Sequence, residues 1–197
     1  MTLTELKTLI QSYLENEETT FVSTLNDFIV NAEDRIFELI QFDYFRKNVT
    51  GNLTTGNTYL TAPSDFLTSF SLAIIDSNND YHYLDKKHTS FMREYSNDAV
   101  ATSERGKPLY YADFDKELST ASNNGSTLIV SPVPDQDYNV ELHYLYKPVS
   151  LTSTTSGTWI SQNARNALLY GSLVEAYTFM KGDADLMQLY EQRFNLE

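Results

Sequence analysis

The sequence predicts an α+β fold: a helical bundle built from the N- and C-terminal helices, with an antiparallel β-rich module inserted between them. Apolar residues recur at helical spacing in residues 1–43 and 152–197, whereas a period of two dominates residues 44–151. A chain of 197 residues with 41% hydrophobic composition can bury a core of its own, and with no cysteine it does so without disulfides. We therefore expect a helical hairpin at 1–43, the β-rich module at 44–151, and C-terminal helices at 152–197 that complete the bundle.

The N-terminal segment predicts two helices that form a hairpin. Thr2 and Glu5 have the spacing of a capping box, and leucines and isoleucines follow at helical spacing. We expect the first helix to end near residues 15–18, the second to begin at residues 23–24, and the second to end near Phe42.

The central segment predicts a series of short strands separated by turn residues. Asn, Asp, Gly and Pro clusters punctuate the alternating apolar pattern. Residues 89–95 predict one or two helical turns instead. The expected strands are Tyr44–Thr50, Thr58–Leu60, Phe66–Asp76, Tyr81–Asp85, Leu109–Phe114, Thr127–Val133 and Tyr138–Tyr146.

The C-terminal segment predicts a long helix, capped by Ser161 and running to Lys181 with Gly182 at its C′ position. A last helix follows, capped by Asp183. The long helix has little polar surface, which predicts that its second apolar face packs against another copy of the chain. The residues expected at that subunit interface are Ala167, Leu168, Gly171 and Val174 on one stripe and Leu169, Leu173 and Tyr177 on the other.

Composition and motifs argue against several functional classes. The chain carries 14 basic and 27 acidic residues, a net charge of −13, which disfavours a DNA-gripping role. The negative charge suits a channel wall that lets DNA slide, and it equally fits an acidic soluble protein. The segment from Asp76 to Asp80 opens like a calcium loop, but Tyr81 and Lys87 stand where Gly and Glu are needed. We find no nucleophile elbow, phosphate loop or metal-ligand spacing, and no membrane-spanning run. We expect no catalytic, cofactor-binding or metal site.

Several segments occur in a recognisable order along the chain: the N-terminal helix pair, Tyr59–Leu67, Gly106–Tyr111, Leu128–Asp135, Val140–Leu151, Trp159–Ile160 and Leu168–Lys181. In this order they resemble the head-to-tail adaptor (connector, head-completion) family of tailed bacteriophages over essentially the full length. One departure is Ala62, where the family commonly has Leu before Pro.

The resemblance implies a structural virion protein, not an enzyme, made in the host cytoplasm and located at the head–tail junction. Its implied partners are further copies of itself in a dodecameric ring, the portal protein, and a tail nozzle or tail tube protein. Genomic double-stranded DNA would pass through the lumen without specific binding. We expect the portal to meet Leu186, Tyr190 and Phe194 near the chain end, and the tail to meet the polar turn Asn123, Asn124 and Gly125.

Two other readings remain open. The 14 tyrosines gather in the predicted strands, which also fits a carbohydrate- or receptor-binding β-module of a phage tail. A small hydrolase that uses carboxylates is the third reading.

Overall fold

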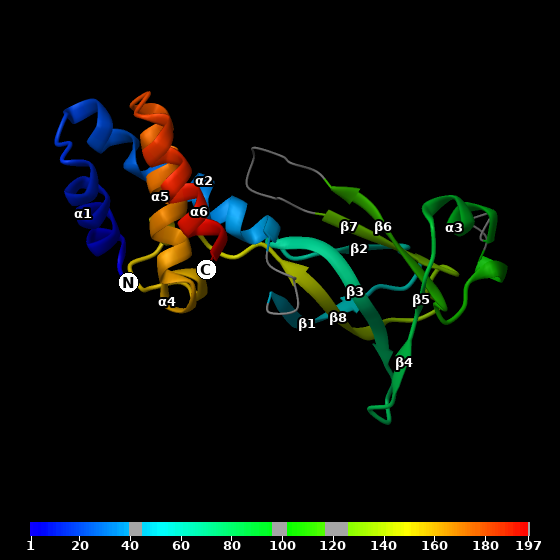
Figure 1. The fold of residues 1–197 in the computed structure, drawn as a ribbon. Helices are drawn as coiled ribbons and strands as arrows, with labels where there is room; N and C mark the ends of the chain where they lie inside the picture. The colour runs from blue at the N-terminus through cyan, green and yellow to red at the C-terminus, as the bar shows by residue number, and fades with distance from the viewer. Residues whose placement is uncertain (40–44, 96–101, 117–125, 197) are drawn as a thin grey trace. The chain divides into compact units, whose positions relative to one another are not determined.

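The computed structural model describes residues 1–39, 45–95, 102–116 and 126–196, and it has the predicted α+β fold (Figure 1). The chain divides into two compact units. The helical unit comprises Met1–Phe42 and Val149–Glu197, and the β unit comprises Asp43–Pro148. The helical unit therefore contains both ends of the chain, and the β unit is inserted between them.

Helices α1 (Leu3–Leu14) and α2 (Thr19–Leu39) open the helical unit. The predicted capping box is present, since the Glu5 amide donates to Thr2 Oγ1 at 3.3 Å and the Thr2 amide donates to Glu5 Oε2 at 2.9 Å. Helix α2 begins about one turn earlier than predicted. Its first turn is prepared by Asn16, whose Oδ1 accepts from the Glu18 amide at 2.9 Å, and it brings Phe21 into the core.

The predicted long C-terminal helix is two helices, α4 (Trp159–Asn163) and α5 (Arg165–Phe179), separated at Ala164. The cap is Thr158 rather than Ser161. Thr158 Oγ1 accepts from the Ser161 amide at 3.2 Å, and Ser161 Oγ accepts from the Thr158 amide at 2.9 Å, so Ser161 is the third residue of a capping box.

The turn after α5 differs from the predicted glycine cap. Lys181, not Gly182, has the left-handed backbone, with φ of 53°. Gly182 is needed for space instead, because a Cβ there would lie 2.3 Å from Tyr177 Cε1. Helix α6 (Ala184–Leu196) follows with Asp183 at its start, as predicted, since the Asp185 amide donates to Asp183 Oδ1 at 2.9 Å.

Helix α5 is the centre of the helical unit and packs against α1, α2, α4 and α6 (Figure 1). Leu151, predicted as part of the β-rich module, lies instead in the 3-10 helix η3 (Leu151–Ser153) and is buried in this core. The buried residues that form the helical core are Leu6, Ile10, Phe21, Leu25, Phe28, Ile29, Ala32, Ile36, Leu151, Ile160, Ala167, Leu168, Leu169, Leu173, Ala176 and Phe194.

The described part of the β unit contains two four-stranded sheets. Sheet A has the order β1 (Arg46–Leu53), β8 (Tyr138–Tyr146), β3 (Phe66–Ile75), β4 (Tyr81–Tyr83), and all its pairs are antiparallel. Sheet B has the order β2 (Tyr59–Thr61), β7 (Ser126–Ser131), β6 (Tyr110–Lys116), β5 (Asp85–Lys86), and only the β5–β6 pair is parallel.

The two sheets pack face to face as a sandwich around one core. Strand β8 shows the predicted alternation, with Tyr138, Val140, Leu142 and Tyr144 buried and the intervening residues more exposed. Leu128 and Val130 of β7 meet this row from sheet B. The other side of sheet B is partly covered by the short helix α3 (Thr89–Tyr95), whose bounds match the prediction, with Met92 packed on Ala112 and Ile129.

Candidate interaction surfaces

The structure places the predicted subunit-interface residues of α5 inside the helical unit. Leu168 and Leu173 are fully buried, and Ala167, Leu169 and Val174 are at most 8% exposed. Both apolar stripes are covered by helices of the same chain, because α2 and α6 pack on α5 together with α1 and α4. The premise that one stripe lacks cover within the subunit is therefore wrong.

The remaining two residues of that set also make contacts within the chain. A Cβ at Gly171 would lie 3.0 Å from Phe194 Cε2 and 3.1 Å from the Ala32 Cβ, so this glycine allows α2 and α6 to approach α5 closely. Tyr177 is half-buried, and its ring meets the ring of Tyr190 edge to face with centroids 5.7 Å apart. These positions bring the helices of one subunit together.

The three residues expected to face the portal differ in exposure. Leu186 is 43% exposed, Tyr190 is half-buried, and Phe194 is only 4% exposed. Phe194 is therefore a core residue rather than part of a surface strip, since its ring lies against Gly171 and under the Arg35 guanidinium at 4.4 Å. Burial raises the pKa of the Tyr190 hydroxyl, with a further contribution from nearby tyrosines such as Tyr177.

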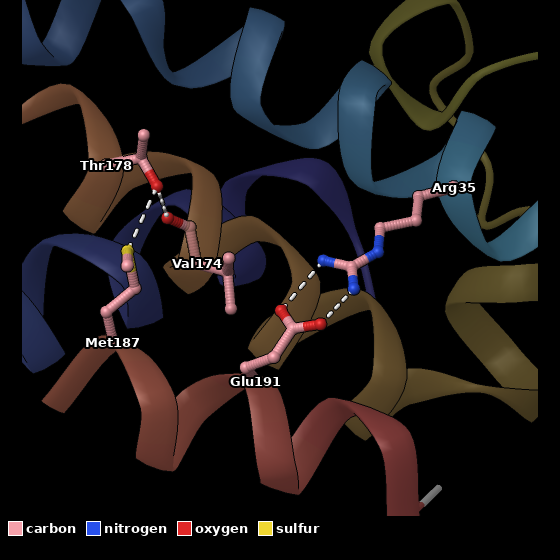
Figure 2. A network of polar contacts seen from close by, with 5 residues as sticks. All are labelled: Arg35, Val174, Thr178, Met187 and Glu191. Atoms are coloured by element: carbon pink, nitrogen blue, oxygen red, sulfur yellow. Dashed lines mark hydrogen bonds and ion pairs between the residues drawn. The ribbon is translucent and has the colours of Figure 1, made fainter. Parts of the chain in front are cut away.

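A network of polar contacts holds α6 on the bundle (Figure 2). Arg35 of α2 donates through both terminal nitrogens to the Glu191 carboxylate, with 2.9 Å between Nη1 and Oε2. The hydrogen bond from Arg35 lowers the pKa of the Glu191 carboxyl. Thr178 Oγ1 donates to the Val174 carbonyl at 2.8 Å and approaches Met187 Sδ at 3.5 Å. These contacts fix which side of α6 faces the core.

The side of α6 turned away from this network carries exposed leucines. Leu186, Leu189 and Leu196 are 43%, 44% and 82% exposed, and their spacing places them on one side of the helix. An exposed apolar stripe is therefore present on α6. We call Leu186, Leu189 and Leu196 the α6 stripe.

The predicted tail-facing residues Asn123, Asn124 and Gly125 lie outside the described residues.

The outer side of sheet A carries a row of large aromatic side chains. Tyr83, Phe70 and Tyr81 are 69%, 57% and 48% exposed. The Arg46 guanidinium lies 4.0 Å from the centre of the Phe70 ring. The His143 ring, on the neighbouring strand β8, has its centroid 5.2 Å from that of Phe70. The Tyr81 hydroxyl approaches Glu141 Oε2 at 3.4 Å, and the Glu141 charge raises the Tyr81 pKa. Surface A is defined as Arg46, Phe70, Tyr81, Tyr83, Glu141 and His143.

The outer side of sheet B carries a second aromatic group beside α3. Tyr59 and Phe114 are each 41% exposed, with ring centroids 5.5 Å apart. Arg93 of α3 donates to the Tyr59 hydroxyl at 3.2 Å, and its guanidinium lies 5.6 Å from the Phe114 ring. The Lys87 ammonium lies 5.5 Å from the Tyr110 ring. Surface B is defined as Tyr59, Lys87, Arg93, Tyr110 and Phe114.

Sequence reasoning noticed the tyrosines in the strands but did not find these two surfaces. Their arginines come from other elements than the rings that they cover. Arg46 is in β1 and Phe70 in β3, while Arg93 is in α3 and Phe114 in β6. The aromatic and arginine residues can be found in the sequence, but which arginine lies over which ring depends on the register of the sheets.

Comparison with known proteins supplies the family. The family model described as SU10 adaptor protein matches residues 1–197, the whole chain. The chain belongs to the SU10 adaptor protein family. No curated protein matches the sequence in a direct comparison. The match confirms the resemblance to phage head-to-tail adaptors seen in the sequence, and an adaptor family suggests a structural protein rather than an enzyme.

The calcium-like loop of this SU10 adaptor is a closed turn. Asp76 Oδ1 accepts from the Asn78 amide at 2.8 Å and the Asp80 amide at 3.0 Å, and Asp76 Oδ2 lies 3.0 Å from His82 Nε2. The His82 contact, followed by these amides, lowers the pKa of Asp76 to about 2. The carboxylate oxygens are thus engaged by the hairpin itself, which is how a short Asx turn is stabilised.

Among the described residues, no cluster of His, Cys, Asp and Glu side chains has the arrangement of a metal site. In the same part of the chain, no helix has the length and apolar character needed to cross a bilayer.

Proposed function

We propose that this SU10 adaptor is a structural component of a phage virion that forms a ring between the portal and the tail. The full-length family match carries the proposal. The exposed aromatic and leucine surfaces support it, because they have the composition of protein–protein interfaces. A net charge of −13 supports a lumen through which DNA passes without counterion-driven binding.

The α6 stripe is the surface we assign to the portal. It replaces the strip that included the buried Phe194, and it keeps Leu186 as its first member. Exposed leucines on one side of a helix fit a groove-binding contact, in which an apolar helix face enters a hydrophobic groove of the partner. The polar residues Asn123, Asn124 and Gly125 stay our proposed contact with the tail nozzle or tail tube.

The assembly is tested on the full chain and on particles of the phage that encodes it. Light scattering after size exclusion measures the mass of the purified adaptor alone and with its portal. Gold-labelled antibody against the adaptor locates it on the virion. A closed oligomer and a label at the head–tail junction are the expected results. A label on the capsid surface or at the distal tail tip would reject the proposal.

The portal contact has its own test. Leu186→Glu combined with Leu189→Glu places two charges on the α6 stripe. We expect phage heads assembled with this variant of the adaptor to lack tails. Thr4→Glu on an exposed position of α1 is the control for added charge in the same unit. Normal tailed particles from the double variant would remove α6 from the portal contact.

The second candidate, a carbohydrate- or receptor-binding β-module of a phage tail, is favoured by one feature of the β unit. An open, polar cavity of about 600 Å³ is lined by amides and carboxylates near the end of the sandwich. Asn52, Asp76, Gln136, Asp137 and Asn139 are among its residues. Retention on a glycan array, abolished by Asn52→Ala and Asn139→Ala together, would support this candidate over the adaptor ring.

A further inference from the structure

Resting on the proposed ring, we infer that neighbouring subunits are joined through the β unit, with surface A of one copy packed against surface B of the next. The occupant of each surface is thus a second copy of this chain. The interface residues predicted on α5 are buried or half-buried within the subunit.

The first argument is the composition of the two surfaces. The water-facing side of an antiparallel sheet is normally polar, yet Tyr83, Phe70 and Tyr81 stand 48–69% exposed on sheet A. Tyr59 and Phe114 are each 41% exposed on sheet B. Each surface also carries an arginine over an aromatic ring, and tyrosine and arginine are the residues most enriched at energetic hot spots of interfaces.

The second argument is placement. In a sandwich, the outer sides of the two sheets face in opposite directions, because the inner sides share one core. Tyr59 of surface B pairs with Ile129, which packs on Met92 of α3 and not in the core shared by the two sheets. The register of sheet A places surface A on the outer side as well. Tyr83 pairs with Ala73 and His143 with Ser71, whereas Leu142 and Val140, the alternate residues of β8, are in the core.

A closed ring needs this arrangement. A twofold dimer uses one self-complementary patch, whereas a head-to-tail ring requires two different patches on different sides of each subunit. Surfaces A and B differ in residue content and lie on opposite outer sides of one sandwich. They satisfy the requirement within the β unit alone.

The third argument is charge complementarity. Surface A contains the carboxylate of Glu141, half-exposed and contacted by the Tyr81 hydroxyl. Surface B contains the guanidinium of Arg93 and the ammonium of Lys87. Surface A also carries the Arg46 guanidinium, which lies over the Phe70 ring, and Lys87 on surface B lies 3.6 Å from the Asp85 carboxylate. The Glu141 carboxylate on one surface and the Arg93 guanidinium on the other therefore favour contact between A and B over contact of B with B. We assign Glu141 of one copy to Arg93 of the next.

Cross-linking tests the assignment without disturbing the aromatic residues. Thr50 pairs with Glu141 on the outer side of sheet A, and Thr61 lies on the outer side of sheet B beside Tyr59; both are exposed. The chain contains no cysteine, so Thr50→Cys and Thr61→Cys supply the only thiols. A short bifunctional maleimide is added to each single variant, to their mixture, and to the double variant.

We expect the mixture to give a covalent dimer, each single variant to remain largely monomeric, and the double variant to give a ladder of oligomers. Dimers of the Thr50→Cys variant alone would indicate a twofold contact and overturn the proposal. The absence of a ladder would overturn it as well. If light scattering then shows an intact ring, the proposed function stands and only this interface is rejected; if no oligomer forms with or without portal, the ring itself is rejected.

A charge exchange measures the specific pair. Glu141→Arg and Arg93→Glu should each weaken association by about tenfold or more, which corresponds to roughly 1.4 kcal/mol. The chain that carries both changes should regain most of the lost association, because every contact again joins opposite charges. Circular dichroism confirms that each variant is folded. Equal weakening in the double variant would exclude this pair.

Discussion

Leu173→Ala tests whether α5 belongs to the core of one subunit. Leu173 is fully buried in the helical core, so the change removes buried carbon atoms and leaves a cavity. Leucine-to-alanine changes at such sites cost about 2–5 kcal/mol, and we expect roughly 3 kcal/mol of the free energy of unfolding. If Leu173 joined two subunits instead, the loss would appear in assembly and would vary with protein concentration.

The assay is urea unfolding followed by the fluorescence of Trp159. This is the single tryptophan, and it lies in α4, so its signal reports on the helical unit. Leu186→Ala is the matched control, since Leu186 is 43% exposed and a surface change of this kind costs at most about 0.5 kcal/mol. Equal midpoints for the two variants, or a midpoint for Leu173→Ala that rises with concentration, would refute the reasoning.

Three further outcomes follow from the contacts described. Glu191→Gln should lower the free energy of unfolding by about 0.5–1 kcal/mol, because the pair with Arg35 is about one-third exposed at each end. Since the Glu191 pKa is lowered by folding, this contribution is present at neutral pH and is lost on acidification. An unchanged dependence of stability on acid pH would contradict this. Asp76 should titrate near pH 2 by NMR, and His82→Asn should raise that midpoint; a normal midpoint in the parent chain would contradict the turn. Gly182→Ala should cost about 1–3 kcal/mol, because its Cβ would displace the Tyr177 ring, and a neutral change would show that the ring moves freely.

The elements with strong local signals were predictable from the sequence. The capping box of Thr2 and Glu5, the alternation in β8 and the short helix α3 depend on residues close together in the chain. The start of α4 was predicted too late for a local reason, since Thr158 and Ser161 both fit a cap and only the folded geometry selects Thr158.

The exposed aromatic surfaces could not be predicted because they depend on register. By a strict period of two, Phe70 would point inward with Phe66 and Leu72. The pairing of β3 with β8 shifts between Phe66 and Thr68 and again between Ser69 and Ser71. These irregularities turn Ser69 inward, where its hydroxyl donates to Asp113 Oδ1 at 2.5 Å, and leave Phe70 outside.

The candidate interface on α5 failed for a different physical reason. An apolar helix in a sequence shows only that both sides are buried, not what buries them. Here Gly171 lets Phe194 and Ala32 approach from two helices of the same chain, so the cover is intramolecular.

The insertion of the β unit between the two halves of the helical unit sets an order of events during synthesis. Leu25 and Ile29 of α2 leave the ribosome early, but their packing partner α5 begins only at Arg165. All strands of the sandwich are translated in between. The apolar side of the first hairpin therefore stays uncovered while the strands are synthesised, and the helical core closes only after α5 and α6 have been made.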